Sequence, residues 1–299
     1  MYSDFRRSIG IESKLSMQNS WDVESLRARV SDPKHRIRYE AGSPNSSEIE
    51  AYENALPSRL LRDTAIVLGM TPELRLLATR LFHKVISIDK NPQAIELYSD
   101  WLPRENRKRE TIVCDEWSNL FQHALKSVSV ILGDGAFGNI LGIQEHKEML
   151  RCIKSALLPQ GVFITRHAFI PKGFIPGENN TDCFVKRFRS RRIDEAEFGF
   201  GVRLLGHYSC CYNPESFILD NRKIFQECEF MHQEGQLIDE EYSYIRRYYF
   251  NGVNCILPED VWESLLDESG FNFEIQPCHG KEWYEYYKVY KCFVNKDEI

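Results

Sequence analysis

The chain of 299 residues is 42% hydrophobic, which is enough to bury a sizeable core in one large α/β domain with additions or in two smaller domains. Its formal net charge of −6 excludes an overall electrostatic footprint for duplex nucleic acid or an anionic membrane. The sequence also lacks a signal-peptide pattern and any apolar stretch of about eighteen residues, so we expect a cytoplasmic protein that does not span a membrane.

Nine cysteines are scattered along the chain without a CxxC pair or a Cys/His cluster at the usual zinc spacing. We therefore expect reduced thiols, with neither a disulfide framework nor a structural metal. Cys210 and Cys211 are adjacent, but no activating neighbour is evident in the sequence. They are predicted to act as two small hydrophobic side chains on a buried segment, and the alternative is redox chemistry.

Residues 1–59 form a polar, charged segment ahead of the first predicted strand. We interpret it as an N-terminal helical lid, in which Trp21 either covers a ligand or anchors a core. The basic run from Arg27 to Arg38 is predicted to be a solvated face rather than an anion site. Ser47 and Glu50 match a capping box, so a helix should begin there and lead into the first strand.

The stretch from Thr64 to Asp89 predicts a strand, a turn, a helix and a second strand. Residues 64–68 are apolar and β-branched, and residues 84–88 return to strand character after apolar residues at helical spacing. Gly69 stands at the turn. Asp89 follows it by about twenty residues, the spacing at which an acid after the second strand binds the ribose hydroxyls of a nucleoside. The pattern therefore indicates a nucleoside site.

Further strands follow, and each ends in polar residues or glycines. Strands are predicted over residues 111–113, 127–132 and 162–165, with helices between them. Repeated strand and helix units imply a parallel, doubly wound sheet with right-handed crossovers, in which ligands bind outside the carboxyl ends of the strands. The residues expected at these ends are Asp115 after the third strand, the turn Gly133-Asp134-Gly135 after the fourth, and His167 after the fifth, facing the crevice.

Residues 169–255 break this pattern and are too many for a simple connection, so we expect a mainly helical insertion that caps the acceptor site. Its many aromatic residues are predicted to form mostly its own core, with an acceptor-binding cage or a homodimer interface as alternatives. The run from Lys186 to Arg192 is strongly basic. We interpret it as a solvated helix face, and the alternative is a site for an anionic acceptor or nucleic acid.

The end of the chain returns to sheet character. A helix is predicted from Pro258 to Gly270, and residues 271–277 and 286–294 are predicted to form an antiparallel pair of strands. The expected organisation has four segments: a lid over 1–59, a cofactor-binding Rossmann-like core over 60–168, the insertion over 169–255, and a helix with a strand hairpin over 256–299 that completes the core.

The nucleoside-type start, the acids after the second and third strands and the terminal hairpin together resemble the class I S-adenosylmethionine-dependent methyltransferases. The segments LGMTPEL, VCDEW, LGDGAFGNI and LLPQGVFITRHAF resemble a bacterial branch with LG-x-TPEL and GDG motifs. The resemblance implies a doubly wound, Rossmann-like sheet of seven strands with an antiparallel last hairpin, and S-adenosylmethionine as cofactor. In one departure, only Gly69 remains of the glycines usual after the first strand, which also counts against a dinucleotide dehydrogenase.

Carried over by position, the resemblance assigns a place to each residue of the site. The turn after the first strand would lie under the methionine part and the ribose; it consists of Leu68, Gly69, Met70, Thr71, Pro72 and Glu73. Asp89 would bind the ribose hydroxyls, and Lys90 would lie beside the adenine. Asp115 would accept from the adenine amino group, with Glu116 and Trp117 nearby. Asp134, with Gly133 and Gly135, would lie by the reacting methyl group.

The implied activity is in-line transfer of a methyl group to an oxygen or nitrogen nucleophile of a small molecule. If the acceptor must lose a proton, His167 and Asp134 are the candidate bases, and the alternative for His167 is a hydrogen-bonded structural role. Other hypotheses are a different enzyme of the same fold, such as an aminopropyl transferase, and a non-catalytic cofactor-binding or scaffold protein. The acidic charge and the short basic run disfavour nucleic-acid methylation.

Overall fold

The computed structural model describes residues 41–57, 63–124 and 127–294. Most of the predicted N-terminal lid, including Trp21 and the basic run, lies outside these residues. The chain divides into two compact units. We call the described residues before Ile175 together with those from Cys255 onward the sheet unit, and residues 175–254 the insertion unit.

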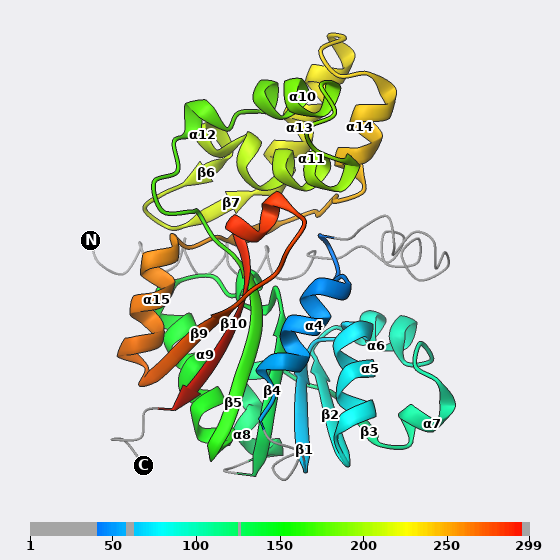
Figure 1. Cartoon of the computed structure of the whole chain (residues 1–299), viewed down its shortest axis with the longest axis vertical. Helices are drawn as coiled ribbons and strands as arrows, with labels where there is room; N and C mark the ends of the chain where they lie inside the picture. Colours follow the sequence, from blue (N-terminus) through cyan, green and yellow to red (C-terminus); the bar gives the residue numbers. More distant parts are fainter. Residues whose placement is uncertain (1–40, 58–62, 125–126, 295–299) are drawn as a thin grey trace, which may run out of the picture. The chain divides into compact units, whose positions relative to one another are not determined.

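The sheet unit contains a seven-stranded sheet in the order β3-β2-β1-β4-β5-β10-β9 (Figure 1). The neighbouring pairs from β3 to β5 are parallel, whereas β10 is antiparallel to both β5 and β9. This order and the antiparallel hairpin confirm the predicted fold. The strands are β1 (Thr64–Leu68), β2 (Lys84–Asp89), β3 (Glu110–Cys114), β4 (Val128–Asp134), β5 (Leu157–Ala168), β9 (Phe271–Gln276) and β10 (Tyr287–Val294).

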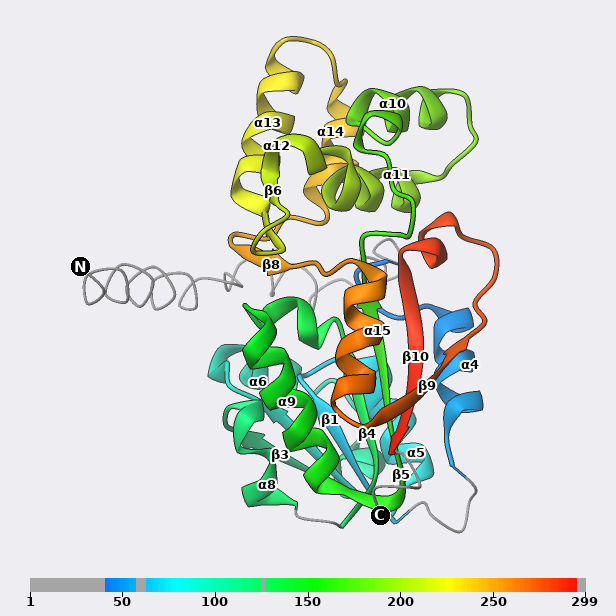
Figure 2. The same ribbon diagram turned by 90° about the vertical axis from the view of Figure 1, so that its left-hand side faces the viewer.

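Helices cover both faces of this sheet. On one face, α4 (Ser46–Ala55) and α5 (Pro72–Leu81) pack against each other and share an apolar core with the central strands. On the other face, α9 (Ile143–Ala156) and α15 (Glu259–Glu268) lie side by side (Figure 2). The shorter helices are α6 (Pro92–Tyr98), α7 (Arg104–Arg107) and α8 (Leu120–His123). Burial of β1 and β4 on both faces explains their nearly continuous apolar sequences.

Among the predicted boundaries that differ from the structure, two have a clear physical reason. The capping box of α4 is formed by Asn45 and Glu48, so the prediction of Ser47 and Glu50 was wrong by two residues. Strand β5 begins at Leu157 rather than Val162, because the chain pairs with Val128 before a register shift. Gly161 lies beside this irregularity, where a Cβ atom would be 2.9 Å from the Val128 carbonyl oxygen. Gly161, which directly precedes the predicted strand, therefore lies within the observed strand.

The insertion unit is mainly helical. Its helices are α10 (Thr181–Arg189), α11 (Glu195–Gly201), a π-helical turn (Val202–Gly206), α12 (Tyr208–Cys211), α13 (Asn221–Gln233) and α14 (Asp239–Arg246). The short strands β6 (Tyr212–Asn213), β7 (Ile218–Asp220) and β8 (Val253–Cys255) form a small sheet. Most of the aromatic side chains in this region are buried or half-buried, and Phe230 is exposed. The interpretation of these aromatics as the core of the insertion is confirmed.

Among the described residues, none of the helices has the length and apolar character that a bilayer crossing requires. All nine cysteines lie in the described part of the chain and are free thiols.

Candidate functional site

The carboxyl ends of β1, β2, β3 and β4 come together at one edge of the sheet. Leu68 is paired with Ile88 on one side and with Gly133 on the other, and Asp89 is paired with Cys114. Because these strands are parallel and in register, the residues that follow them emerge at the same edge. The structure therefore brings together the turn after β1, Asp89, the segment from Asp115 to Trp117, and the turn from Gly133 to Gly135.

Gly69 makes the turn after β1. Its φ of 90° lies in the left-handed region that favours glycine. A Cβ atom at this position would lie 3.7 Å from Asp89 Oδ2 and 3.8 Å from Trp117 Cζ2. The Ile88 carbonyl oxygen accepts from Gly69 N and from Trp117 Nε1, each at 2.7 Å. One carbonyl thus fixes both the turn and the indole ring beside Asp89.

The Asp89 carboxylate is oriented by backbone donors. Its Oδ1 accepts from Asn91 N at 2.8 Å. Burial raises the pKa of Asp89, while hydrogen bonds from the backbone of Asn91 and Met70 act in the opposite direction. The next residue, Lys90, is exposed and forms a 3.4 Å ion pair with Glu116. Asp89 is therefore a fixed, half-buried acceptor, and Lys90 and Glu116 form a solvated pair beside it.

Asp115 is held in a local network that sequence reasoning missed. Its Oδ1 accepts from Glu116 N and from Asn119 Nδ2, each at 2.8 Å. Its Oδ2 lies 2.8 Å from His123 Nε2. The hydrogen bonds from Asn119 and His123 lower the pKa of Asp115. Since an ionised carboxylate offers about four acceptor positions, three internal contacts leave capacity for one further donor.

Asp134 belongs to a buried ion network. Arg166 Nε donates to Asp134 Oδ1 at 2.7 Å, and Arg166 Nη1 donates to Glu48 Oε2 at 2.7 Å. The guanidinium lies 4.3 Å from the ring centre of Tyr287. Burial works against the charge of Arg166, but the carboxylates of Asp134 and Glu48 outweigh it and raise the Arg166 pKa. The Asp134 carboxylate therefore forms a buried ion pair within the turn from Gly133 to Gly135.

Tyr52 ties helix α4 to the end of β4. Its hydroxyl donates to the Gly133 carbonyl oxygen at 2.5 Å and accepts from Arg166 N at 2.8 Å. Gly135 N donates to the Arg166 carbonyl oxygen at 2.9 Å, and a Cβ atom on Gly135 would lie 3.2 Å from Tyr287 Oη. No sequence pattern indicated Glu48, Tyr52, Arg166 or Tyr287 as residues of this site. The one available signal was a charged residue, Arg166, ending an apolar strand.

His167 does not face the edge of the sheet, so that prediction was wrong. Its side chain is 1% exposed and lies among Phe137, Phe169 and Trp262, with ring centres 6.1, 4.6 and 5.0 Å away. Neither ring nitrogen has a hydrogen-bond partner among the described residues, and burial lowers the pKa of His167 well below its usual value. Successive residues of a strand point to opposite faces, and Arg166 takes the α4 side.

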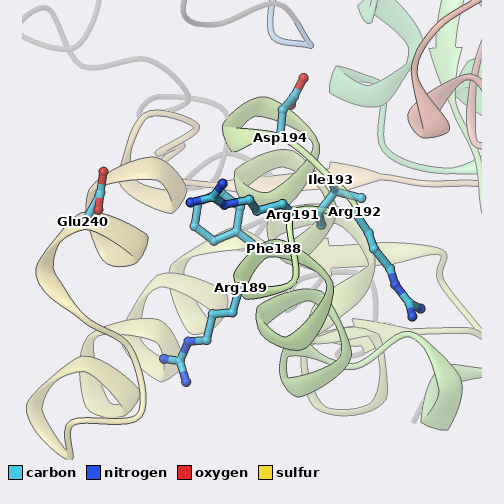
Figure 3. A pocket seen from close by; sticks show the side chains of 7 residues that line it. All are labelled: Phe188, Arg189, Arg191, Arg192, Ile193, Asp194 and Glu240. Atoms are coloured by element: carbon cyan, nitrogen blue, oxygen red, sulfur yellow. The ribbon is translucent and has the colours of Figure 1, made fainter.

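The basic run of the insertion lies around a surface hollow of about 640 Å³. Figure 3 shows that Arg189, Arg192 and Glu240 extend in different directions rather than toward a common point. Arg189 also donates to Glu241 at 2.7 and 2.9 Å. This arrangement fits the interpretation of a solvated helix face better than a convergent anion site.

No protein-family model matches the sequence, and no curated protein sequence matches it either. Among solved structures, a protein from Rhodobacter sphaeroides, provisionally named as a zinc-dependent alcohol dehydrogenase, is similar over 85% of this chain and 92% of its own. The TM-score is 0.50 and the identity 14%. At this identity the similarity concerns the fold alone.

Two S-adenosylmethionine-dependent methyltransferases are also similar in structure. The one from Clostridium acetobutylicum has a TM-score of 0.49 and 11% identity, covering 83% of this chain and 90% of its own. The one from Methanosarcina mazei has a TM-score of 0.48 and 14% identity, covering 82% of this chain and 97% of its own.

The strand order itself distinguishes between nucleotide-binding sheets. In a dinucleotide-binding Rossmann sheet the strand beyond β5 continues the parallel order. Here β10 inserts between β5 and β9 and is antiparallel to both. The chain therefore has the fold of the class I S-adenosylmethionine-dependent methyltransferases.

Proposed function

We propose that this protein is an S-adenosylmethionine-dependent methyltransferase that acts on an oxygen or nitrogen nucleophile of a small molecule. The observation that carries the proposal is the convergence of Gly69, Asp89, Asp115 with Trp117, and the Gly133 to Gly135 turn at one edge of a methyltransferase-type sheet. In this proposal these groups would contact the adenine, the ribose and the methionine part of the cofactor.

The residues at this edge fit the cofactor chemically. The space that a Cβ atom of Gly69 would occupy is bordered by a carboxylate oxygen and an indole ring, which suit a ribose hydroxyl and a flat base. Asp89 would hold the ribose, and Asp115, Lys90, Glu116 and Trp117 would surround the adenine. The turn from Leu68 to Glu73 would lie under the methionine part. When bound, the cofactor supplies a methyl group activated by its sulfonium.

In this proposal the protein acts chiefly by positioning. Asp134 is paired with Arg166, and His167 is enclosed by aromatic rings, so neither is arranged as a free base. The Glu48, Tyr52 and Arg166 contacts instead hold the Gly133 to Gly135 turn in one conformation. Alignment of a nucleophile and exclusion of water can supply much of the barrier reduction in such a displacement.

The proposal is tested by calorimetric titration of the full chain with S-adenosylmethionine, and separately with its decarboxylated form and with NADH. Saturable binding of S-adenosylmethionine alone is expected. Tighter binding of the decarboxylated form would indicate an aminopropyl transferase, and tighter binding of NADH would contradict the proposal. A screen of cell extract with methyl-labelled cofactor, read by mass spectrometry, then identifies the acceptor. Binding without transfer to any component would favour a non-catalytic protein.

A further inference from the structure

Three potential metal ligands gather in the insertion unit. One ligand atom from each of His207, Cys210 and Cys211 lies within 4.8 Å of the other two. Cys210 Sγ lies 3.4 Å from Cys211 Sγ and 3.9 Å from His207 Nδ1. The two cysteines were predicted to be core hydrophobes, because HxxCC does not match a usual zinc-ligand spacing.

The local backbone produces this gathering. Residue 207 follows the π-helical turn Val202–Gly206, and its carbonyl oxygen accepts from Cys210 N at 3.2 Å and from Cys211 N at 2.9 Å. Residues three and four apart on a helical turn lie on the same side. The imidazole and both thiols are therefore brought together by a single turn of chain, without a contribution from a distant segment.

The imidazole is oriented by neighbours on its other nitrogen. The Thr181 hydroxyl donates to the Gly206 carbonyl oxygen at 3.2 Å, so its oxygen can accept from His207 Nε2 at 3.0 Å. Cys228 Sγ lies 3.3 Å from the same nitrogen. With hydrogen on Nε2, the lone pair of Nδ1 is directed toward the cysteines. A second hydrogen-bond partner that fixes the ring is the usual support of a metal-binding histidine.

We propose that His207 Nδ1, Cys210 Sγ and Cys211 Sγ form a binding site for a thiophilic cation, with Zn²⁺ as the expected ion. Tetrahedral zinc with ordinary bond lengths would set its sulfur ligands about 3.8 Å apart and a sulfur and a nitrogen about 3.6 Å apart. The observed 3.4 and 3.9 Å differ from these values by only a few tenths of an ångström.

Charge and access agree with this ion. Binding forms two metal–sulfur bonds and one metal–nitrogen bond, and the two thiol protons pass to solvent. Two thiolates neutralise Zn²⁺, so no net charge is buried with Cys211 and His207. Cys210 is exposed, so the ion can enter from solvent and keep a water as its fourth ligand. The site uses no residue of the sheet unit and is independent of the proposed methyl transfer.

The test begins with the reduced full chain, dialysed against Zn²⁺ and then assayed for bound metal. One equivalent of zinc is expected. Cys210→Ser and Cys211→Ser should each weaken zinc binding at least about tenfold, and each should remove about half of the thiolate-to-cobalt charge-transfer band of the Co²⁺-substituted protein. Cys183→Ser, which changes a half-buried thiol of α10 in the same unit, should leave both readouts unchanged.

Substitution of Thr181 tests whether the hydrogen bond that orients His207 contributes to zinc binding. Thr181→Val should weaken zinc binding about tenfold, and Thr181→Ser, which keeps the hydroxyl, should restore it. Absence of stoichiometric zinc, or equal zinc affinity in the cysteine variants, would overturn the proposal. Retention of Cu⁺ in preference to Zn²⁺ would keep the site but overturn the assigned ion. A Cys210–Cys211 disulfide that persists after treatment with a thiol reductant, seen by mass spectrometry, would also contradict it.

Discussion

Asp89 is the residue on which cofactor affinity should depend most directly. It ends β2, is oriented by Asn91 N, and directs Oδ2 toward the Gly69 turn. Asp89→Ala should raise the Kd for S-adenosylmethionine about 10- to 100-fold, since a hydrogen bond to a charged group contributes about 1.5–3 kcal/mol. Isothermal titration calorimetry measures the change.

Two further variants separate binding from folding in this experiment. Asp89→Asn keeps an acceptor for Asn91 N and so preserves the local turn, while it removes the charge. Asp63→Ala removes an exposed acid at the opposite end of the sheet, just before β1, and should leave Kd unchanged. An unaltered Kd in Asp89→Ala would mean that this edge is not the ribose site.

The aromatic residues around His167 indicate a structural role for its side chain rather than a role as a base. His167→Phe should fit among Phe137, Phe169 and Trp262 with a change of less than about 1.5 kcal/mol in unfolding free energy. Methyl transfer to the acceptor found by the screen should stay within about threefold of the native rate. Loss of a general base would instead lower the rate by about 10² to 10⁴. Steady-state kinetics distinguishes these outcomes.

At the scale of elements, the turn between β1 and α5 must accommodate both a left-handed residue and a ligand. Gly69→Ala should cost about 1–2 kcal/mol in stability, and it should also abolish cofactor binding because the new methyl group fills the space beside Asp89 and Trp117. Denaturant unfolding and calorimetry, performed on the same preparation, separate the two effects.

Gly173→Ala is the matched control. Gly173 has a φ of 75°, yet nothing lies within 4 Å of the position its Cβ atom would take. This variant should lose a similar amount of stability through backbone strain, and it should bind cofactor with the native affinity. Equal loss of binding in both variants would show that backbone strain, and not the occupied space, is responsible.

Helix α4 shows how an element outside the strand pattern takes part in the site. Glu48 and Tyr52 lie one turn apart on it and reach Arg166 and Gly133 at the ends of β5 and β4. Replacing one member of a buried ion pair usually costs about 3–5 kcal/mol because the other charge remains unpaired. The capping box of Asn45 and Glu48 also starts this helix, so Glu48 serves both the helix and the network.

At the scale of the whole molecule, buried histidines contribute to the response to acid. Burial lowers the pKa of His146 and His167 below the usual value near 6.5. Both are therefore neutral in the folded protein, and their contribution to stability is full above about pH 6.5. The unfolded chain binds more protons below that pH, so unfolding free energy should fall as pH is lowered from 7.5 to 5.

Urea unfolding at several pH values measures this dependence, and His167→Phe should make it shallower. Glu48 and Asp89 act in the opposite direction, because burial raises the pKa of each and protonation favours the folded state as pH falls. Comparing the native chain with His167→Phe cancels the contributions of both acids. An identical pH dependence in the two proteins would contradict the assignment of His167 as a buried neutral residue.

The sequence by itself determined the repeated strand and helix units, the bounds of β1, the start of β2, and the polar residues that follow successive strands. These features depend on periodicity and on residues close in the chain. The starts of α4 and β5 were misplaced, because a capping residue and a paired strand, rather than the nearest turn signal, decide where each begins.

Only the tertiary structure decided which of these residues are available for chemistry. It placed His167 among aromatic rings. It also paired Asp134 of β4 with Arg166 of β5. In the insertion unit, it brought the Thr181 hydroxyl of α10 to the His207 imidazole. A sequence gives the order of chemical groups, whereas their burial, partners and orientation depend on long-range packing that no local pattern encodes.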